Sequence, residues 1–272
     1  MMNKYAVFGN PIEHSLSPVI HENFAKSLQI QLTYTAILGS IGKFESEAKN
    51  FLANGGEGFN VTLPFKQDAF KFSDIKSDIS NITKSVNTIT YKDGIIYGDN
   101  TDGIGFIKDF TQNLGQNIKN KKILLVGAGG AAMGVIPNIL MELPKELKIY
   151  NRTELKAQNL ANQFKALGPI DILDQNNINK VNFDLIINAT SIGINNLKFS
   201  LPSNTFNKNT ICYDMSYGNA SRSFMIWAEY NNLKFYDGLG MLIEQAAESF
   251  FIWQNKKPNI TEELKNLLRK KL

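Results

Sequence analysis

Residues 121–140 read KKILLVGAGGAAMGVIPNIL, an apolar run followed by a glycine-rich turn and a second apolar run. Gly127, Gly129 and Ala132 fit the pattern G-x-G-x-x-G/A, which is typical of dinucleotide-binding turns between a strand and a helix. The first glycine makes the tight turn, the second lets a pyrophosphate approach the backbone, and the alanine lets the helix pack closely on the strand. A plain glycine turn is the alternative, but the strand before it and the helix after it favour a Rossmann-type unit.

The next expected strand ends in YNRT, residues 150–153, and indicates which dinucleotide binds. An NAD site usually has Asp or Glu at this strand end, where the carboxylate holds the ribose 2′-hydroxyl. Asn151 and Arg152 stand there instead. An arginine can bind a 2′-phosphate through charge-assisted hydrogen bonds, whereas a carboxylate would repel it. The sequence therefore predicts NADP, with an exposed arginine at a strand end as the alternative.

Strands and helices alternate along all 272 residues, which predicts an α/β fold with parallel sheets. We expect two domains. An N-terminal α/β substrate-binding domain covers residues 1–102 and is completed by helices within 239–272. A Rossmann-type domain with a doubly wound parallel sheet covers residues 103–238 and binds NADP. Two domains joined by two crossings of the chain can close on a ligand, so we also expect a cleft that closes.

Composition narrows the class of protein further. Hydrophobic residues make up 43% and charged residues 20% of the chain, and the only cysteine is Cys212. No apolar run approaches the ~18 residues that a membrane span needs, and the start lacks the pattern of a secretory signal, so we expect a cytoplasmic protein. One cysteine and two histidines argue against a structural metal site. The net charge of +4 and the basic end LLRKKL raise the question of nucleic acid, but cations suit the last turn of a helix, so we expect no nucleic-acid or membrane partner.

Three polar stretches follow expected strands. NVTLPFK, residues 60–66, places Lys66 in the first turn of a helix, where an exposed cation is disfavoured by about 0.3–1 kcal/mol. GDNTDG, residues 98–103, holds Asp102, and HSLSP, residues 14–18, holds two serines. Because ligands of open α/β sheets bind beyond the carboxyl ends of the strands, these side chains can line one site. The alternatives are a solvated surface lysine and helix capping by residues such as Ser17.

Nine motifs follow one another from about Tyr5 to Trp253: YAVFGNPIEHSLSP, NVTLPFK, VNTI, GDNTDGIGF, GAGGAA, NRT, NATSIG, YDMSY and DGLGMLIEQAA. With these motifs in this order, the whole chain resembles the shikimate dehydrogenase family. This resemblance implies NADPH-dependent, reversible reduction of 3-dehydroshikimate to shikimate, on the route to chorismate and the aromatic amino acids.

The resemblance also implies roles for particular residues, with Lys66 as the catalytic lysine and Asp102 as its acidic partner. The chain departs from the family after the glycine turn, where it reads AAM, and at Lys156, where the family often has arginine. The implied substrate contacts are Ser15, Ser17, Thr62, Lys66, Asn87, Asp102, Tyr217 and Gln245. The implied cofactor contacts are Asp78, Gly127, Ala128, Gly129, Gly130, Ala131, Asn151, Arg152, Thr153, Lys156, Met215 and Gly238.

Two other functions remain open at this point. One is a quinate/shikimate dehydrogenase that uses NAD, and the other is a non-catalytic sensor of NADP or a metabolite on the same fold. The presence of both Lys66 and Asp102 argues against a sensor, which has no need of that pair. The sequence allows either a monomer or a homodimer.

Overall fold

The chain forms two compact units in the computed structural model, which describes residues 3–173, 181–193 and 197–272. Unit 1 combines the N-terminal part up to Gly105 with Ile243–Lys271, and unit 2 is Phe106–Leu242 together with Leu272. The borders fall inside two helices, α5 (Asp102–Ile107) and α9 (Leu239–Gln254). The last helical segment thus returns to the N-terminal unit.

Unit 1 is built on a six-stranded mixed sheet in the order β2-β1-β3-β5-β6-β4. The first three strands along the chain are parallel, but β5 is antiparallel to both β3 and β6. The sheet therefore contains both parallel and antiparallel pairs, and the two-residue turn at Asp93 and Gly94 joins β5 and β6 into a hairpin, as an Asp-Gly pair between two strands favours. Both turn residues have positive φ, 53° and 80°. The strands are β1 (Asn3–Gly9), β2 (Leu32–Leu38), β3 (Gly58–Val61), β4 (Ile75–Lys76), β5 (Thr88–Lys92) and β6 (Ile95–Asp99).

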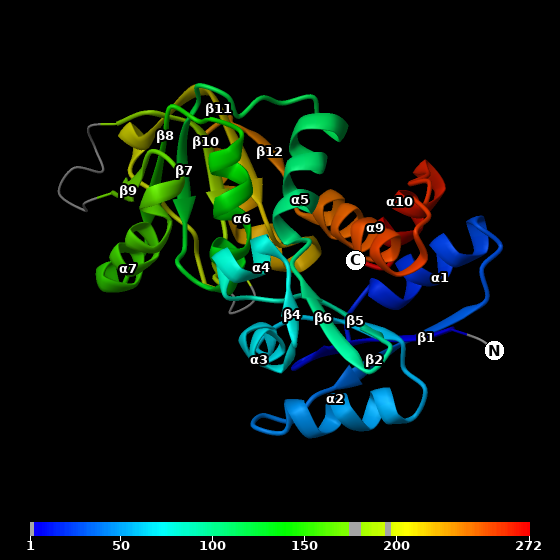
Figure 1. Cartoon of the computed structure of the whole chain (residues 1–272). Helices are drawn as coiled ribbons and strands as arrows, with labels where there is room; N and C mark the ends of the chain where they lie inside the picture. Colours follow the sequence, from blue (N-terminus) through cyan, green and yellow to red (C-terminus); the bar gives the residue numbers. More distant parts are fainter. Residues whose placement is uncertain (1–2, 174–180, 194–196) are drawn as a thin grey trace. The chain divides into compact units, whose positions relative to one another are not determined.

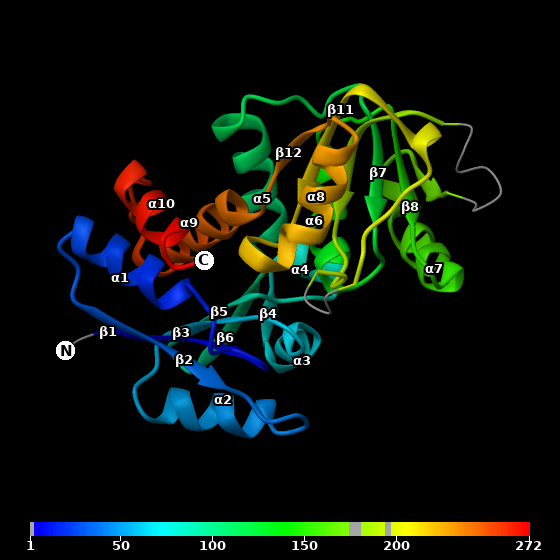
Figure 2. The same cartoon turned by 180° about the vertical axis from the view of Figure 1, so that it is seen from behind.

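Helices cover both faces of this sheet, as Figures 1 and 2 show. Along β1, Ala6 and Phe8 pack in one buried cluster with residues of α2 and α3, whereas Tyr5 and Val7 pack in another with Trp253 of α9. This alternation follows from the two-residue repeat of a strand. The helices are α1 (Ser17–Ser27), α2 (Phe44–Ala53), α3 (Lys66–Phe72), α4 (Asp78–Thr83), α9 and α10 (Glu262–Arg269).

Unit 2 is built on a six-stranded sheet in the order β12-β11-β10-β7-β8-β9, with all neighbours parallel. Counted along the chain from β7, the order from the β9 edge is 3-2-1-4-5-6, which is the Rossmann order. The predicted doubly wound parallel sheet is confirmed. The strands are β7 (Lys122–Val126), β8 (Glu146–Tyr150), β9 (Ile170–Ile172), β10 (Phe183–Asn188), β11 (Phe206–Asp214) and β12 (Lys234–Tyr236).

Both faces of the second sheet are buried, as expected for parallel strands joined by helices. Leu124 and Val126 pack in one cluster with Phe224 and Trp227 of α8, and Leu125 between them is also fully buried. α7 and α8 cover opposite faces (Figures 1 and 2). Among the described residues the helices are α6 (Gly130–Met141), α7 (Glu154–Phe164), α8 (Arg222–Tyr230), a π-helix (Lys108–Asn113) that continues α5, and short 3₁₀ turns (Lys165–Leu167, Ser203–Thr205, Gly218–Ser221).

Candidate active site

Lys66 is the first residue of α3 and follows the carboxyl end of β3 by a four-residue turn. The turn is anchored by Phe65, which is buried and stacks on Phe44 of α2 with ring centroids 5.5 Å apart. The Lys66 side chain is only 17% exposed, and its Nζ donates a hydrogen bond to Asp102 Oδ2 at 2.5 Å. Lys66 is therefore a partly buried, paired cation and not a solvated surface lysine.

Asp102 begins α5, and its carboxylate is held on both oxygens. Oδ2 accepts from Lys66, and Oδ1 accepts from Asn87 Nδ2 at 2.9 Å. The start of α5 is stabilised by another side chain, because Asn100 Oδ1 accepts the backbone N–H of Asp102 at 3.1 Å. Since Asn100 does the capping, the Asp102 carboxylate remains available for the lysine.

Asn87 joins this pair to helix α9. Its Oδ1 accepts the backbone N–H of Thr101 at 2.9 Å, and its Nδ2 lies 3.3 Å from Gln245 Oε1. A backbone N–H can only donate, so this contact fixes which end of the Asn87 amide carries the oxygen. Four of the residues predicted to contact substrate, Lys66, Asn87, Asp102 and Gln245, therefore meet in one hydrogen-bonded group within unit 1.

The remaining predicted substrate residues of unit 1 lie at the ends of neighbouring strands. Ser17 is 7% exposed, and its backbone N–H donates to Ser15 Oγ at 3.3 Å. Ser17 is the first residue of α1 and Leu16 is its N-cap, so the alternative that Ser17 caps the helix is wrong. Thr62 follows β3 and packs against Gly9, where an added Cβ would come within 2.5 Å of the Thr62 methyl. Among the described residues, no side-chain hydrogen bond joins these three to Lys66.

The predicted phosphate-binding turn lies in unit 2 between β7 and α6. Gly127 has a φ of +113°, and an added Cβ would come within 2.9 Å of the Ala189 carbonyl oxygen. Gly129 is the N-cap of α6, and added Cβ atoms at Gly129 or Gly130 would meet no atom within 4 Å. The first turn of α6 has no acidic residue and no side-chain cap. Its open backbone N–H groups therefore fit a pyrophosphate at a helix N-terminus.

The predicted 2′-phosphate clamp follows β8, which neighbours β7 in the same sheet. Arg152, Thr153 and Lys156 are exposed, and Asn151 Nδ2 donates to the Thr153 carbonyl at 2.8 Å. Within the part of the chain that the structure describes, the Arg152 and Lys156 side chains have no ion pair or hydrogen bond. Arg152 and Lys156, which have no partners among the described residues, follow the strand next to the glycine turn of β7. Their charges are suited to binding the 2′-phosphate of a dinucleotide.

The remaining predicted positions are divided between the units. Met215 and Tyr217 follow β11 in unit 2, and Gly238 donates its N–H to the Ser216 carbonyl at 2.8 Å. Gly238 has no room for a side chain, because an added Cβ would lie 2.4 Å from the Met215 carbonyl oxygen. Tyr217 is half-buried, and burial raises the pKa of its phenol. Asp78 is exposed at the start of α4 in unit 1.

A buried carboxylate holds the loop after β11. Asp214 accepts from Asn188 Nδ2 at 2.9 Å and from the backbone N–H of Ser216 at 2.8 Å. Burial, reinforced by the charge of Asp237, raises its pKa to about 6, while the hydrogen bonds oppose the rise. Neither residue is among those predicted from the sequence, although Asn188 lies in the NATSIG motif and Asp214 in the YDMSY motif.

Sequence analysis also misses buried polar residues beneath the Lys66 group. Tyr34, Asn60, Thr88 and Ser249 are each at most 6% exposed and are hydrogen-bonded to one another or to Asn87. The signal that could have found them is polarity at buried strand positions. Asn60, for example, lies between two core residues of β3.

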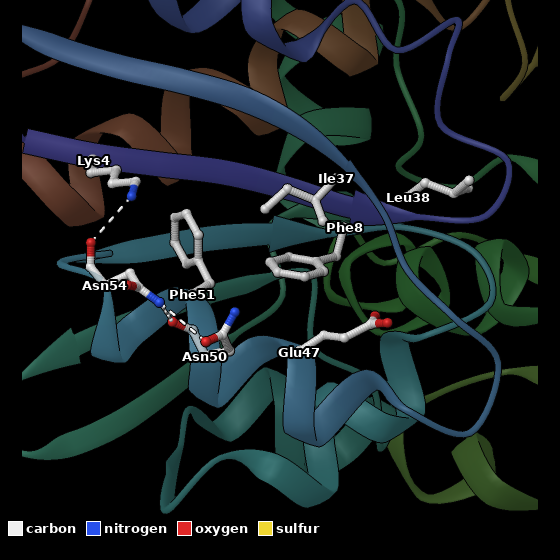
Figure 3. A pocket seen from close by; sticks show the side chains of 8 residues that line it. All are labelled: Lys4, Phe8, Ile37, Leu38, Glu47, Asn50, Phe51 and Asn54. Carbon is white, nitrogen blue, oxygen red and sulfur yellow. Dashed lines mark hydrogen bonds between the residues drawn. The ribbon is translucent and has the colours of Figure 1, made fainter.

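An open groove of about 440 Å³ lies between β1, β2 and α2, away from these residues (Figure 3). Phe8 and Phe51 line it, with Lys4 and Glu47 toward its two ends, and Lys4 Nζ donates to the Asn54 carbonyl at 3.1 Å. None of the predicted site residues lines this groove.

The described residues contain no group of three or more His, Cys, Asp and Glu side chains that could hold a metal ion. Among the same residues, no helix is both long enough and apolar enough to cross a membrane.

Comparisons with known proteins cover nearly the whole chain. Three family models match, described as the shikimate dehydrogenase substrate binding domain at residues 7–89, shikimate / quinate 5-dehydrogenase at residues 109–200, and the shikimate 5′-dehydrogenase C-terminal domain at residues 238–267. The chain is 42% identical to the shikimate dehydrogenase (NADP(+)) of Chromobacterium violaceum, with both chains covered in full. It is 45% identical to the enzyme of that name from Vesicomyosocius okutanii, over 98% of this chain and all of the relative. The crystal structure of shikimate 5-dehydrogenase from Thermus thermophilus in complex with NADP(H) and shikimate is 29% identical, with a TM-score of 0.86 and full coverage of both chains.

Proposed function

Because this chain belongs to the shikimate dehydrogenase family, we propose that it reversibly reduces 3-dehydroshikimate to shikimate with NADPH, and that Lys66 and Asp102 are its proton-transfer pair. The reaction belongs to the biosynthesis of chorismate and the aromatic amino acids. The observation that carries the proposal is the partly buried hydrogen bond of 2.5 Å between Lys66 Nζ and Asp102 Oδ2, with Asn87 and Gln245 beside it.

The chemistry needs a proton donor at the ketone. When bound, NADPH supplies the hydride for the carbonyl carbon, and the carbonyl oxygen gains negative charge. A donor must then lie within about 2.6–3.2 Å of that oxygen. Lys66 is suited to this task because its ammonium can donate a proton during reduction and its amine can accept one during oxidation. Asp102 accepts the hydrogen bond from Nζ and so fixes its direction.

Neither histidine is a convincing alternative to the lysine. His14 is exposed in the serine loop. His21 is fully buried, and neither of its ring nitrogens has a hydrogen-bond partner among the described residues. A side chain sealed in this way cannot reach a substrate.

Binding of the substrate is assigned to short polar side chains. Ser15, Ser17, Thr62, Asn87 and Gln245 can hydrogen-bond a carboxylate and ring hydroxyls; we include Tyr217 as a sixth contact. A site built to pair hydroxyls strongly rejects analogues that lack them. The proposal therefore predicts a preference for the hydroxylated ring acid over deoxy analogues.

Binding of the cofactor is assigned to the glycine turn and to the end of β8. Gly127 to Ala131 would hold the pyrophosphate, and Asn151 to Lys156 the 2′-phosphate, with Met215 and Gly238 toward the nicotinamide. The absence of an acid in YNRT favours NADP over NAD, and so does Arg152, whose side chain has no partner among the residues that the structure describes. We also propose that Asp78 contributes on the cofactor side. A cytoplasmic location is proposed because the single cysteine, Cys212, is free and fully buried, as suits a reducing compartment.

Turnover of 3-dehydroshikimate with NADPH, followed by the absorbance of the reduced nicotinamide, tests the proposal. NADH, and quinate with NAD, are the comparison assays. Turnover with NADPH and the loss of at least about 100-fold in kcat for Lys66→Ala are the expected results, because that is the lower range for general acid–base catalysis. Lys71→Ala, an exposed lysine on the same helix, is the matched control.

The alternatives give different results in the same assays. A quinate/shikimate dehydrogenase would turn over quinate with NAD at least as well as shikimate with NADP. A sensor would bind NADP or the acid without turnover. A Lys66→Ala enzyme with near-normal kcat and a raised KM would make the lysine a binding residue and move the proton to water or another group.

A further inference from the structure

A chain of hydrogen bonds between buried side chains leads from β2, an edge strand of the unit 1 sheet, to Asp102. Its members are Tyr34 on β2, Asn60 on β3, Thr88 at the start of β5, and Asn87 just before it. Their exposed fractions are 3%, 6%, 1% and 2%. Only Asn87 belongs to the predicted substrate contacts, so the other three polar side chains need a different explanation.

The first half of this chain has a fixed direction. Asn60 Nδ2 lies 3.1 Å from the backbone carbonyl of Asn87, which can only accept. The amide oxygen of Asn60 must therefore face Tyr34, whose O–H donates to it at 2.7 Å. The second hydrogen of Nδ2 goes to Thr88 Oγ1 at 3.2 Å or to Ser249 Oγ at 3.0 Å. Tyr34 thus donates to Asn60, and Asn60 donates to the hydroxyl pair of Thr88 and Ser249.

The second half continues in the same direction. Thr88 Oγ1 lies 2.8 Å from Asn87 Oδ1, which can only accept, so the threonine hydrogen belongs there. Ser249 lies 2.8 Å from the same threonine, but its own hydrogen can go to the Gln245 carbonyl at 3.0 Å. Asn87 then donates through Nδ2 to Asp102 Oδ1 at 2.9 Å. Every link points toward the carboxylate.

We propose that Thr88 is a positioning residue for proton transfer, acting through Asn87 on Asp102. The Thr88 hydroxyl helps to hold the amide oxygen of Asn87 away from the carboxylate, so that its N–H donates there. This proposal rests on the proposed function of the Lys66–Asp102 pair.

The physical reason is the cost of the reversed amide. If the Asn87 side chain turned by half a rotation, its oxygen would face the Asp102 carboxylate and its NH₂ would face the Thr101 N–H. Both contacts are unfavourable, and the low dielectric of a buried site strengthens them. Hydrogen bonds that run in one direction also polarise one another, which strengthens the donor at the end of the chain. Loss of the Thr88 hydroxyl removes one of the groups that hold the correct orientation.

Thr83 offers a matched control for a merely structural hydroxyl. It is fully buried in the same unit, and its Oγ1 donates to the Ile79 carbonyl at 2.8 Å. None of its hydrogen bonds touches the chain from Tyr34 to Asp102. Thr88→Val and Thr83→Val each remove a buried hydroxyl while keeping the side-chain shape, so both should lower the thermal midpoint.

The kinetic expectations separate the two variants. For Thr88→Val, kcat should fall about tenfold, the change that corresponds to one hydrogen bond of about 1.4 kcal/mol. The KM for shikimate should stay within about twofold, because the loss falls on the chemical step. Thr83→Val should keep the wild-type kcat. In an Asp102→Asn background, Thr88→Val should add little further loss, because the two residues act as a unit.

A second pair of variants tests the remote end of the chain. Tyr34→Phe removes the first donor, and Tyr5→Phe is its control. Both tyrosines are 3% exposed and lie close to Trp253, but the Tyr5 hydroxyl bonds Glu57 and Gln254 instead of Asn60. Tyr34→Phe should lower kcat and Tyr5→Phe should not. This pair decides the matter if Thr88→Val does not fold.

The proposal is overturned if Thr88→Val and Thr83→Val have the same kcat. It is also overturned if Thr88→Val lowers kcat by an equal factor with and without Asp102→Asn, since Thr88 would then not act through that carboxylate. If Thr88→Val does not fold, equal kcat for Tyr34→Phe and Tyr5→Phe overturns it. Failure of the proposed function would look different, as absent turnover in the wild type or an unaffected Lys66→Ala enzyme.

Discussion

His21 predicts a specific loss of stability in acid. It lies on α1 in unit 1, fully buried, and its ring stacks on Tyr34 with centroids 4.2 Å apart and planes 4° apart. Trp253 lies on the same ring at 5.3 Å. Burial lowers the pKa of His21 from 6.5 to about 3, and the nearby Asn60 side chain only partly opposes this.

The direction and size of the effect follow from proton binding. Below pH 6.5 the unfolded chain binds a proton at this histidine, and the folded chain does not until the pH is near 3. The unfolded state then binds more protons, so the free energy of unfolding falls as the pH falls through this window. At pH 5, about 1.5 units below the unfolded pKa and at about 1.4 kcal/mol per unit, the loss is about 2 kcal/mol.

Urea unfolding at pH 7.5 and pH 5 measures this loss. The chain has two tryptophans, and a Trp227→Phe background leaves Trp253, the ring beside His21, as the fluorescence reporter. In this background, His21→Phe keeps a ring in the stack and removes the titration. The change in the free energy of unfolding between the two pH values should be about 2 kcal/mol larger with His21 than with phenylalanine.

Comparing the two chains cancels the other titrating groups. Asp214 is one of them, and it acts in the opposite sense. Its folded pKa is raised from 3.8 to about 6, so its contribution to stability is lost as the pH rises through that window. Equal pH dependence for His21 and its phenylalanine variant would refute the reasoning, because the buried ring would then accept a proton without cost.

Three further predictions concern the proposed reaction. Asp102→Ala should lower kcat about as much as Lys66→Ala in steady-state kinetics. The double variant should lower kcat by far less than the product of the two single factors, and a loss equal to that product would contradict a joint role. NADP should be preferred over NAD at least about tenfold, ~1.4 kcal/mol, and Arg152→Ala should remove this preference while NAD rates stay nearly unchanged. Equal kcat/KM for the two cofactors in the wild type would exclude the clamp. Ser17→Ala should mainly raise the KM for shikimate, and an unchanged KM would remove this serine from the substrate site.

The fold was predictable where local signals are strong. The strand–glycine–helix of residues 121–140 and the Asp93-Gly94 hairpin each specify a structure through backbone chemistry. Sequence analysis does not place β4 and β9, which have two and three residues, because a periodic pattern cannot show in so short a segment. The π-helix after α5 is also not predictable, because its apolar pattern is that of an ordinary α-helix end.

The candidate site was predictable where a charged residue follows a strand. Lys66 and Asp102 stand out because cations and carboxylates are rarely placed there without a partner. Tyr34 and Thr88 do not stand out, because tyrosine and threonine are common in strands and their hydroxyls become notable only once burial is known. Ser249 follows Gln245 by one helical turn, and only the packing of α9 on the sheet gives it a polar environment.

The partly buried ion pair of Lys66 and Asp102 itself argues for catalysis over sensing. Taking two charges out of water costs several kcal/mol for each ion, and well-packed apolar residues of similar volume are often as stable or more so. Stability therefore does not explain why unit 1 keeps Lys66 and Asp102 at 17% and 10% exposure. Binding alone does not explain it either, because neutral donors such as Asn87 and Gln245 suffice to pair hydroxyls. Proton transfer does require a group that holds and releases a proton beside a fixed counter-charge, and the donor chain ending on Asp102 Oδ1 provides that fixed position.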